Sequence, residues 1–196
     1  MSNILQSNKR FLLWASEIYI ITVAIVVVSA WLNNLHPYEL NLTVSKYIGL
    51  QRWTAVLYFF MALLICLMLA IYIFKTKFRL IRKYVYFFVL LQILGCAVFP
   101  SMGKIDRIST MTHKSFAYSL IFGIALSFTL MLIWGTTIRQ KLYSIIGILY
   151  SIWFVFFYSV KDEMFMKTIF IWENLIILLL LIELAVEDTS LDKPKK

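Results

Sequence analysis

Residues that break helices, ligate metals or carry charge are all scarce in this chain of 196 residues. There are 6 glycines, 3 prolines, 2 cysteines and 2 histidines, and only 15% of the residues are charged. By contrast, 62% are hydrophobic, and the mean hydropathy is +0.84. A water-soluble chain of this length cannot bury so much apolar surface, so the composition excludes a soluble domain and favours a lipid bilayer. The lack of a linker rich in Pro, Gly or Ser predicts a single domain over residues 1–196.

The cysteines and histidines do not fit a known metal or redox motif. Cys66 and Cys96 each lie inside an apolar run, with no CxxC neighbour and no nearby histidine, which argues against a disulfide and against a zinc site. His36 and His113 are far apart in the chain and belong to no HExxH pattern. We therefore predict no metal and no cofactor. The alternative is a haem or a metal ion held through His36 and His113.

Six apolar runs make up most of the chain, and we interpret each as a transmembrane helix. They cover residues 11–32, 53–74, 84–99, 116–134, 142–160 and 168–186. About 20 helical residues cross the hydrocarbon core of a bilayer, so the third run is short and needs tilt or help from its flanking residues. The predicted fold class is an all-α integral membrane bundle of six transmembrane helices.

Positive charges lie mainly between the runs and predict the orientation. Of the 19 Lys and Arg residues, twelve fall on the side of the amino terminus and seven on the other side, which places both termini in the cytoplasm. The densest basic loop follows the second run and contains Lys75, Lys77, Arg79, Arg82 and Lys83. The net charge of +9 does not indicate nucleic-acid binding, because no basic stripe lies on a soluble module. We predict a multi-pass protein of a bacterial cytoplasmic membrane.

The polar loop between the third and fourth runs, together with nearby helix ends, is the main candidate site. Arg52 and His113 enter their runs at the outer level, and Glu173 lies close to that level in the sixth run. We expect an outward-facing polar pocket formed by Arg52, Asp106, Arg107, His113 and Glu173. In an enzyme, His113 with Asp106 or Glu173 would serve as acid and base. The alternative is an interhelical salt bridge that holds the bundle together, and both interpretations stay open.

Two more carboxylates lie inside the runs, near the cytoplasmic ends. Glu17 and Glu183 are costly in lipid unless they are paired or hydrated, and we find no basic residue mid-span to pair with them. Either they carry protons, or their side chains reach the inner interface. Near the outer end of the fifth run, four aromatic residues either grip an acyl chain or only pack: Phe154, Phe156, Phe157 and Tyr158.

Several short motifs in a fixed order resemble a known family. In chain order they are Ser45–Gly49, Phe99–Pro100, His113 and Glu173. In this order the chain resembles, over nearly its whole length, the uncharacterised bacterial six-span membrane family catalogued as domain of unknown function 998. Asn174 stands where that family has an Arg after its Glu, so a Glu–Arg pair does not carry over. The resemblance implies a six-helix bundle and no settled activity.

These features support three hypotheses of function. The leading one is a non-enzymatic bundle that binds a lipid or a protein through its outward face, as an accessory, sensor or immunity-type component. Its partners would be membrane lipids, with a protein partner or a homo-oligomer as further options. A small transporter or lipid-handling permease would need a hydrated path from Glu173 to Glu17 or Glu183, and the lack of Pro inside the runs counts against a broken-helix transport site. An intramembrane enzyme acting on a lipid headgroup would use His113.

Overall fold

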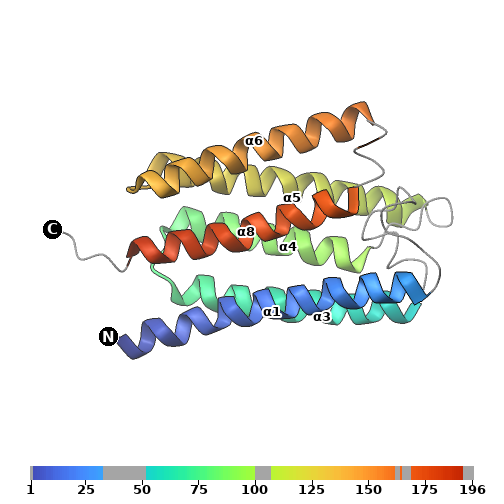
Figure 1. The fold of residues 1–196 in the computed structure, drawn as a ribbon, viewed down its shortest axis with the longest axis horizontal. Helices are drawn as coiled ribbons and strands as arrows, with labels where there is room; N and C mark the ends of the chain where they lie inside the picture. Colours follow the sequence, from blue (N-terminus) through green and yellow to red (C-terminus); the bar gives the residue numbers. More distant parts are fainter. Residues whose placement is uncertain (1, 33–51, 100–106, 162–163, 165–168, 192–196) are drawn as a thin grey trace.

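The computed structural model of the chain is an all-helical bundle (Figure 1). It describes every residue except 1, 33–51, 100–106, 162–163, 165–168 and 192–196, and every side chain in the helices except those of residues 2–8, 52, 170 and 187–191. Six helices occur in this described part: α1 (Ser2–Leu32), α3 (Arg52–Lys75), α4 (Leu80–Val98), α5 (Arg107–Trp134), α6 (Ile138–Val160) and α8 (Ile169–Leu191). No strand occurs among the described residues, so the all-α prediction is confirmed.

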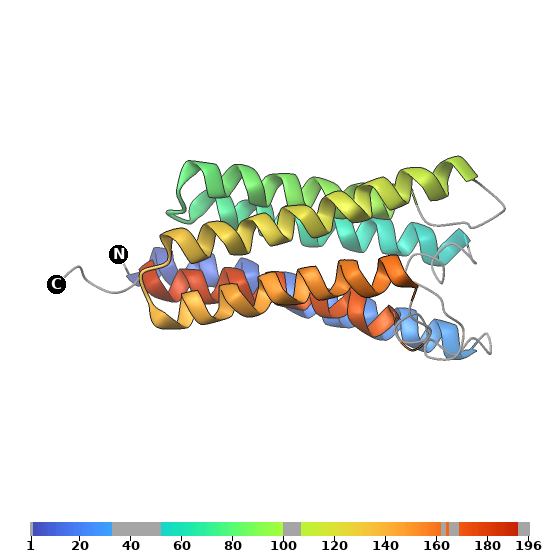
Figure 2. The same cartoon turned by 90° about the horizontal axis from the view of Figure 1, so that it is seen from above.

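The helices lie in two layers (Figures 1 and 2). One layer contains α1, α8 and α6, and the other contains α3, α4 and α5, so that α8 and α4 are the middle helices. Helices adjacent in the chain pack against each other, and a contact between α1 and α8 closes the ring. The start of α1 and the end of α8 lie at the same end of the bundle, which we call the terminal end (Figure 1).

The outward surface of the bundle is apolar. Five of the described helices are long and apolar enough to cross a membrane: Lys9–Leu32, Trp53–Lys75, Leu80–Val98, Arg107–Trp134 and Ile138–Val160. Large hydrophobic side chains are exposed along them, among them Ile20, Phe60, Phe122, Leu149 and Ile152. Soluble proteins rarely expose so much continuous apolar surface, whereas lipid solvates it. The chain is therefore a polytopic helical membrane protein.

Four helices begin four or more residues earlier than the apolar runs predict; of these, α1 begins at Ser2 and not at Phe11, and α6 begins at Ile138 and not at Leu142. Helix α5 begins at Arg107 and not at Phe116, and α4 begins at Leu80 and not at Tyr84. The polar loop expected between the third and fourth runs is therefore wrong from residue 107 onward. The reason is that no Gly or Pro lies between residue 104 and residue 122, so nothing in the sequence ends the helix at the edge of the apolar run.

Two glycines bring neighbouring helices close together. A Cβ atom on Gly95 of α4 would collide with the ring of Phe116 on α5. A Cβ atom on Gly147 of α6 would collide with the ring of Phe128, also on α5. Small residues at these positions allow large aromatic rings to pack against backbone, which is a common way for helices to associate in a membrane.

Candidate functional site

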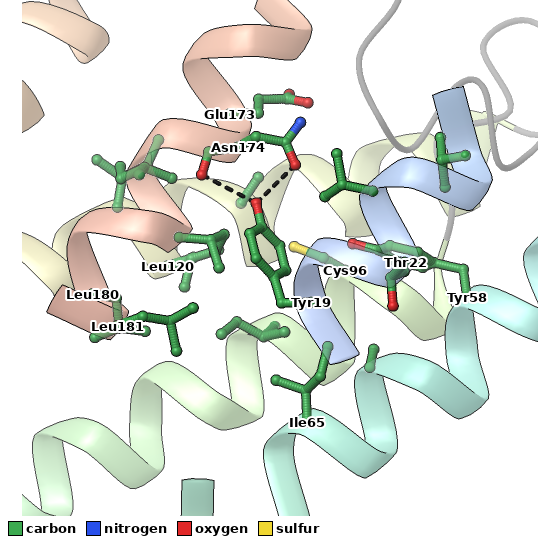
Figure 3. Close-up of a pocket in the computed structure, with 18 of the residues that line it drawn as sticks. Tyr19, Thr22, Tyr58, Ile65, Cys96, Leu120, Glu173, Asn174, Leu180 and Leu181 are labelled. Atoms are coloured by element: carbon green, nitrogen blue, oxygen red, sulfur yellow. Dashed lines mark hydrogen bonds between the residues drawn. The ribbon is translucent and has the colours of Figure 1, made fainter. Parts of the chain in front are cut away.

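A cavity of about 140 Å³ lies inside the bundle (Figure 3). Most of its lining residues belong to the halves of the helices away from the terminal end. Residues from all six helices line it. Its apolar walls include Ile65, Leu69, Ile121, Phe154, Leu180 and Leu181. Its polar lining residues include Tyr19, Tyr58, Cys96, His113, Glu173 and Asn174.

Polar and apolar lining residues are separated along α3, α5 and α8, but not along α1, where Val26 lies farther from the terminal end than Tyr19 and Thr22. On α8, Glu173 and Asn174 lie near the start of the helix, while Leu180 lies deeper in the bundle. On α3, Tyr58 is likewise nearer the helix start than Leu69. The cavity therefore has a polar end, away from the terminal end, and an apolar part toward the middle of the bundle.

Tyr19 connects α1 to α8 at the polar end. Its hydroxyl donates toward Asn174, at 2.7 Å from the side-chain oxygen Oδ1 and 3.1 Å from the backbone carbonyl oxygen (Figure 3). Because the two acceptors belong to one residue, this contact fixes the rotamer of Asn174 as well as the spacing of the two helices. It also satisfies two polar side chains that would otherwise be costly inside a bundle.

His113 is buried on α5, with 9% of its surface exposed. Its Nδ1 lies 2.8 Å from the carbonyl oxygen of Phe99 and 3.3 Å from that of Cys96, both at the end of α4. Carbonyl oxygens only accept hydrogen bonds, so Nδ1 carries the hydrogen and donates it. In the neutral ring, Nε2 is then an acceptor, and no partner for it occurs among the described residues.

Tyr58 and Glu173 complete the polar end. Tyr58 extends from α3 into the cavity lining, and its hydroxyl has no hydrogen-bond partner among the residues that the structure describes (Figure 3). Glu173 lies half-buried beside Asn174 on α8. The structure thus brings together His113 and Glu173, two of the predicted site residues, in the lining of one cavity.

A separate buried ionic cluster lies nearer the terminal end. Arg82 of α4 and Glu183 of α8 are 3% and 0% exposed, and Nη2 of Arg82 lies 3.2 Å from Oε1 of Glu183. The hydroxyl of Tyr86 accepts from the same Nη2 at 2.6 Å and lies 3.1 Å from Oε1. The hydroxyl of Ser127 on α5 donates to Oε2 at 2.8 Å. Both oxygens of the carboxylate are therefore engaged, and three helices are joined.

The location predicted for Arg82 is wrong. We expected it in a basic loop, but it lies in the first turn of α4 and points into the bundle toward Glu183. The sequence offers no basic residue mid-span to pair with Glu183, and Arg82 reaches it instead from the first turn of α4. Glu17 differs from Glu183, because its side chain is exposed on α1.

Of the other predicted site residues, none that the structure describes lines the cavity. Arg107 is the first residue of α5 and is exposed. Asp106, His36 and the side chain of Arg52 lie outside the described residues. Among the residues that were described, no group of three or more His, Cys, Asp or Glu side chains is arranged to hold a metal ion. The haem or metal alternative through His36 and His113 therefore stays a prediction.

Comparison with known protein families, curated proteins and solved structures finds no match to this chain. The resemblance to domain of unknown function 998 thus stays a prediction that rests on the short motifs alone.

Proposed function

We propose that this membrane protein binds a lipid in the cavity between its two helical layers and acts as a non-enzymatic accessory or sensor component. The lipid tail would lie along the apolar part, and the headgroup would lie at the polar end. The observation that carries the proposal is the separation of polar from apolar lining within one cavity. This separation matches the two parts of an amphipathic molecule, and the surrounding bilayer supplies such molecules at high concentration.

The size of the cavity suits part of a lipid tail. Its volume of about 140 Å³ is close to that of a dry cavity of about 150 Å³ lined by Leu, Ile and Phe, which binds benzene. A short stretch of acyl chain has comparable bulk. The rest of the lipid would extend beyond the cavity along the helices.

Two observations favour binding over the alternatives. First, His113 forms no hydrogen bond to Glu173, because its Nδ1 donates to backbone carbonyls and its Nε2 has no partner among the described residues, so the pairing with that carboxylate expected of an enzyme is not formed there. Second, the side chains on α8 and α5 between the polar end of the cavity and the residues around Glu183 are apolar and buried, with Leu180 1% and Ile124 0% exposed. A proton or ion path from Glu173 to Glu183 would need polar groups or water there.

Native mass spectrometry of the gently extracted full chain tests this proposal, with a variant that fills the cavity. Ala62 is 4% exposed and lines the cavity, so Ala62→Phe introduces a ring where the tail would lie. Ala24 is exposed on the outer surface of α1, so Ala24→Phe is a matched control of the same size change. We expect the wild-type protein and Ala24→Phe to retain lipid and Ala62→Phe to lose most of it.

Equal lipid retention by folded Ala62→Phe and Ala24→Phe would refute binding in the cavity. Circular dichroism of both variants establishes that the helices are intact. A wild-type protein that carries no lipid after mild extraction would refute the proposal without any variant.

A further inference from the structure

We propose that the terminal end of the bundle carries a second lipid site, at which Arg79 binds the phosphate of an anionic phospholipid. This site is separate from the cavity, so the inference goes beyond the proposed function. It follows from the charge, the exposure and the contacts of two short turns at that end.

Two turns that connect helices lie close together at the terminal end (Figures 1 and 2). Residues 76–79 link α3 to α4, and residues 135–137 link α5 to α6. The guanidinium carbon Cζ of Arg79 lies 4.9 Å from the ring centre of Trp134, the last residue of α5. This cation–π contact joins the first turn to the start of the second.

The two turns and the helix starts after them carry positive charges and no negative ones. Residues 75–83 and 134–141 contain no Asp or Glu. Lys77, Arg79, Arg139 and Lys141 are exposed, and we call these four residues the basic surface. Within the described part of the chain, none of their side chains forms an ion pair or a hydrogen bond. The basic surface is therefore available to an anion.

Arg79 is the best-placed residue of the basic surface to hold a phosphate. Its contact with Trp134 restrains the guanidinium, yet no N–H group donates to an oxygen or nitrogen atom of the described residues. A guanidinium presents its N–H donors in a fork that matches two oxygens of a phosphate. Because the side chain is already restrained, less rotamer freedom is lost when the phosphate binds.

The apolar side chains beside Arg79 indicate that the phosphate belongs to a lipid. Leu80 and Ile81, which follow Arg79, are 65% and 57% exposed, and Ile133 beside Trp134 is 64% exposed. Arg79 thus lies where the apolar outer surface of the bundle ends, which is the level of the phospholipid headgroups. A phospholipid bound there can extend its acyl chains along these residues, whereas a soluble anion cannot use them.

The positive charge of the basic surface selects among phospholipids. Clusters of Lys and Arg next to transmembrane helices attract lipids with a net negative charge. Phosphatidylcholine and phosphatidylethanolamine also have a phosphate, but their cationic groups are repelled by the neighbouring Lys and Arg side chains. A headgroup with a net negative charge, such as that of phosphatidylglycerol, is therefore favoured.

Delipidated full chain in detergent micelles is titrated with phosphatidylglycerol or phosphatidylcholine of identical acyl chains and followed by native mass spectrometry. The basic surface is exposed, so detergent displaces its lipid during extraction and the lipid has to be added back. We expect phosphatidylglycerol to bind about tenfold more tightly, as one or two basic residues acting on its charge would produce. Ala62→Phe fills the cavity and should show the same preference, because the second site lies elsewhere.

Variants of Arg79 assign the preference to the terminal end. Arg79→Gln should remove most of it, and Arg79→Lys, which keeps the charge without the fork, should retain part of it. Arg107→Gln is the matched control, since Arg107 is exposed at the start of α5, at the opposite end of the bundle. Circular dichroism establishes that the helices of each variant are intact.

Three outcomes would overturn the inference. The first is equal binding of the two lipids by the wild-type protein or by folded Ala62→Phe. The second is an equal preference for phosphatidylglycerol in Arg79→Gln and Arg107→Gln. The third is displacement of phosphatidylglycerol by an equal concentration of inorganic phosphate, which would make the site one for a soluble anion. A preference that persists in Ala62→Phe supports the inference whatever the cavity binds.

Discussion

The buried pair of Arg82 and Glu183 makes the strongest prediction about stability. Both side chains are almost fully buried, and the carboxylate is bonded to Arg82, Tyr86 and Ser127. Removing one partner of such a pair leaves a buried charge without compensation and costs about 3–5 kcal/mol. We therefore expect Arg82→Met and Glu183→Leu each to destabilise the bundle by several kcal/mol.

The two single variants should not be equal. Arg82 lies in the first turn of α4, so in Glu183→Leu its long side chain can extend toward the interface at the terminal end. Glu183 has a shorter side chain on the middle helix of its layer, and in Arg82→Met it stays in an apolar environment. Arg82→Met should thus cost more than Glu183→Leu. Replacing the whole pair with apolar residues is often neutral, so the double variant should be close to the wild type.

Unfolding in mixed micelles by added SDS, followed by the fluorescence of the 6 tryptophans, measures these differences. Lys77→Met and Glu17→Leu are controls, because they remove the same charges from exposed positions. The reasoning is refuted if Arg82→Met costs no more than Lys77→Met. It is also refuted if the costs of the two single variants simply add in the double variant, since a buried pair requires strong coupling between them.

Three further predictions concern local contacts, each checked in the same unfolding assay. Gly147→Leu should destabilise the bundle by about 1–3 kcal/mol or more, because the new side chain meets the ring of Phe128; an unchanged midpoint would contradict the close approach of α5 and α6. Tyr19→Phe should cost about 1 kcal/mol through loss of the hydrogen bond to Asn174, whereas exposed Tyr84→Phe should cost nothing measurable. Thr137→Ala should cost about 1 kcal/mol by removing the capping box of α6, and Thr137→Ser should restore most of it.

The helices themselves are predictable from the sequence, because an apolar run of sufficient length has few alternatives to a membrane helix. Their ends are less predictable. Leu80–Lys83 and the residues from Arg107 to Ser115 were expected to be loop because charged or polar residues interrupt the hydrophobic pattern there. A helix nevertheless continues until a residue such as Gly or Pro ends it. Hydropathy alone does not show where a helix ends once it has left the hydrocarbon core of the bilayer.

The candidate site was predictable only in part. His113 and Glu173 stand out in the sequence because polar groups in apolar surroundings need a partner, and the structure places both in the lining of one cavity. Tyr19 and Tyr58 gave no signal, since tyrosines in membrane helices more often lie at interfaces or pack.

The ionic cluster was missed for a different reason. The spacing of Arg82 and Tyr86 by four residues places them on one face of a helix, which could have indicated an inward-facing polar pair. Glu183 lies opposite them because of the order of the helices around the bundle. The spacing of hydrophobic residues does not encode that order.

The central claim, that a lipid tail lies inside the bundle, is tested most directly by photo-crosslinking. A phosphatidylethanolamine with a diazirine in its acyl chain is incorporated into membranes that contain the full chain, and the labelled residues are mapped by peptide mass spectrometry. Helix α3 provides its own control, since Ile65 and Leu69 line the cavity while Leu64 and Leu67 are exposed on the outer surface. We predict labelling of Ile65 and Leu69 that is lost in Ala62→Phe, with labelling of Leu64 and Leu67 unchanged. Labelling confined to Leu64 and Leu67 in the wild-type protein would contradict the claim.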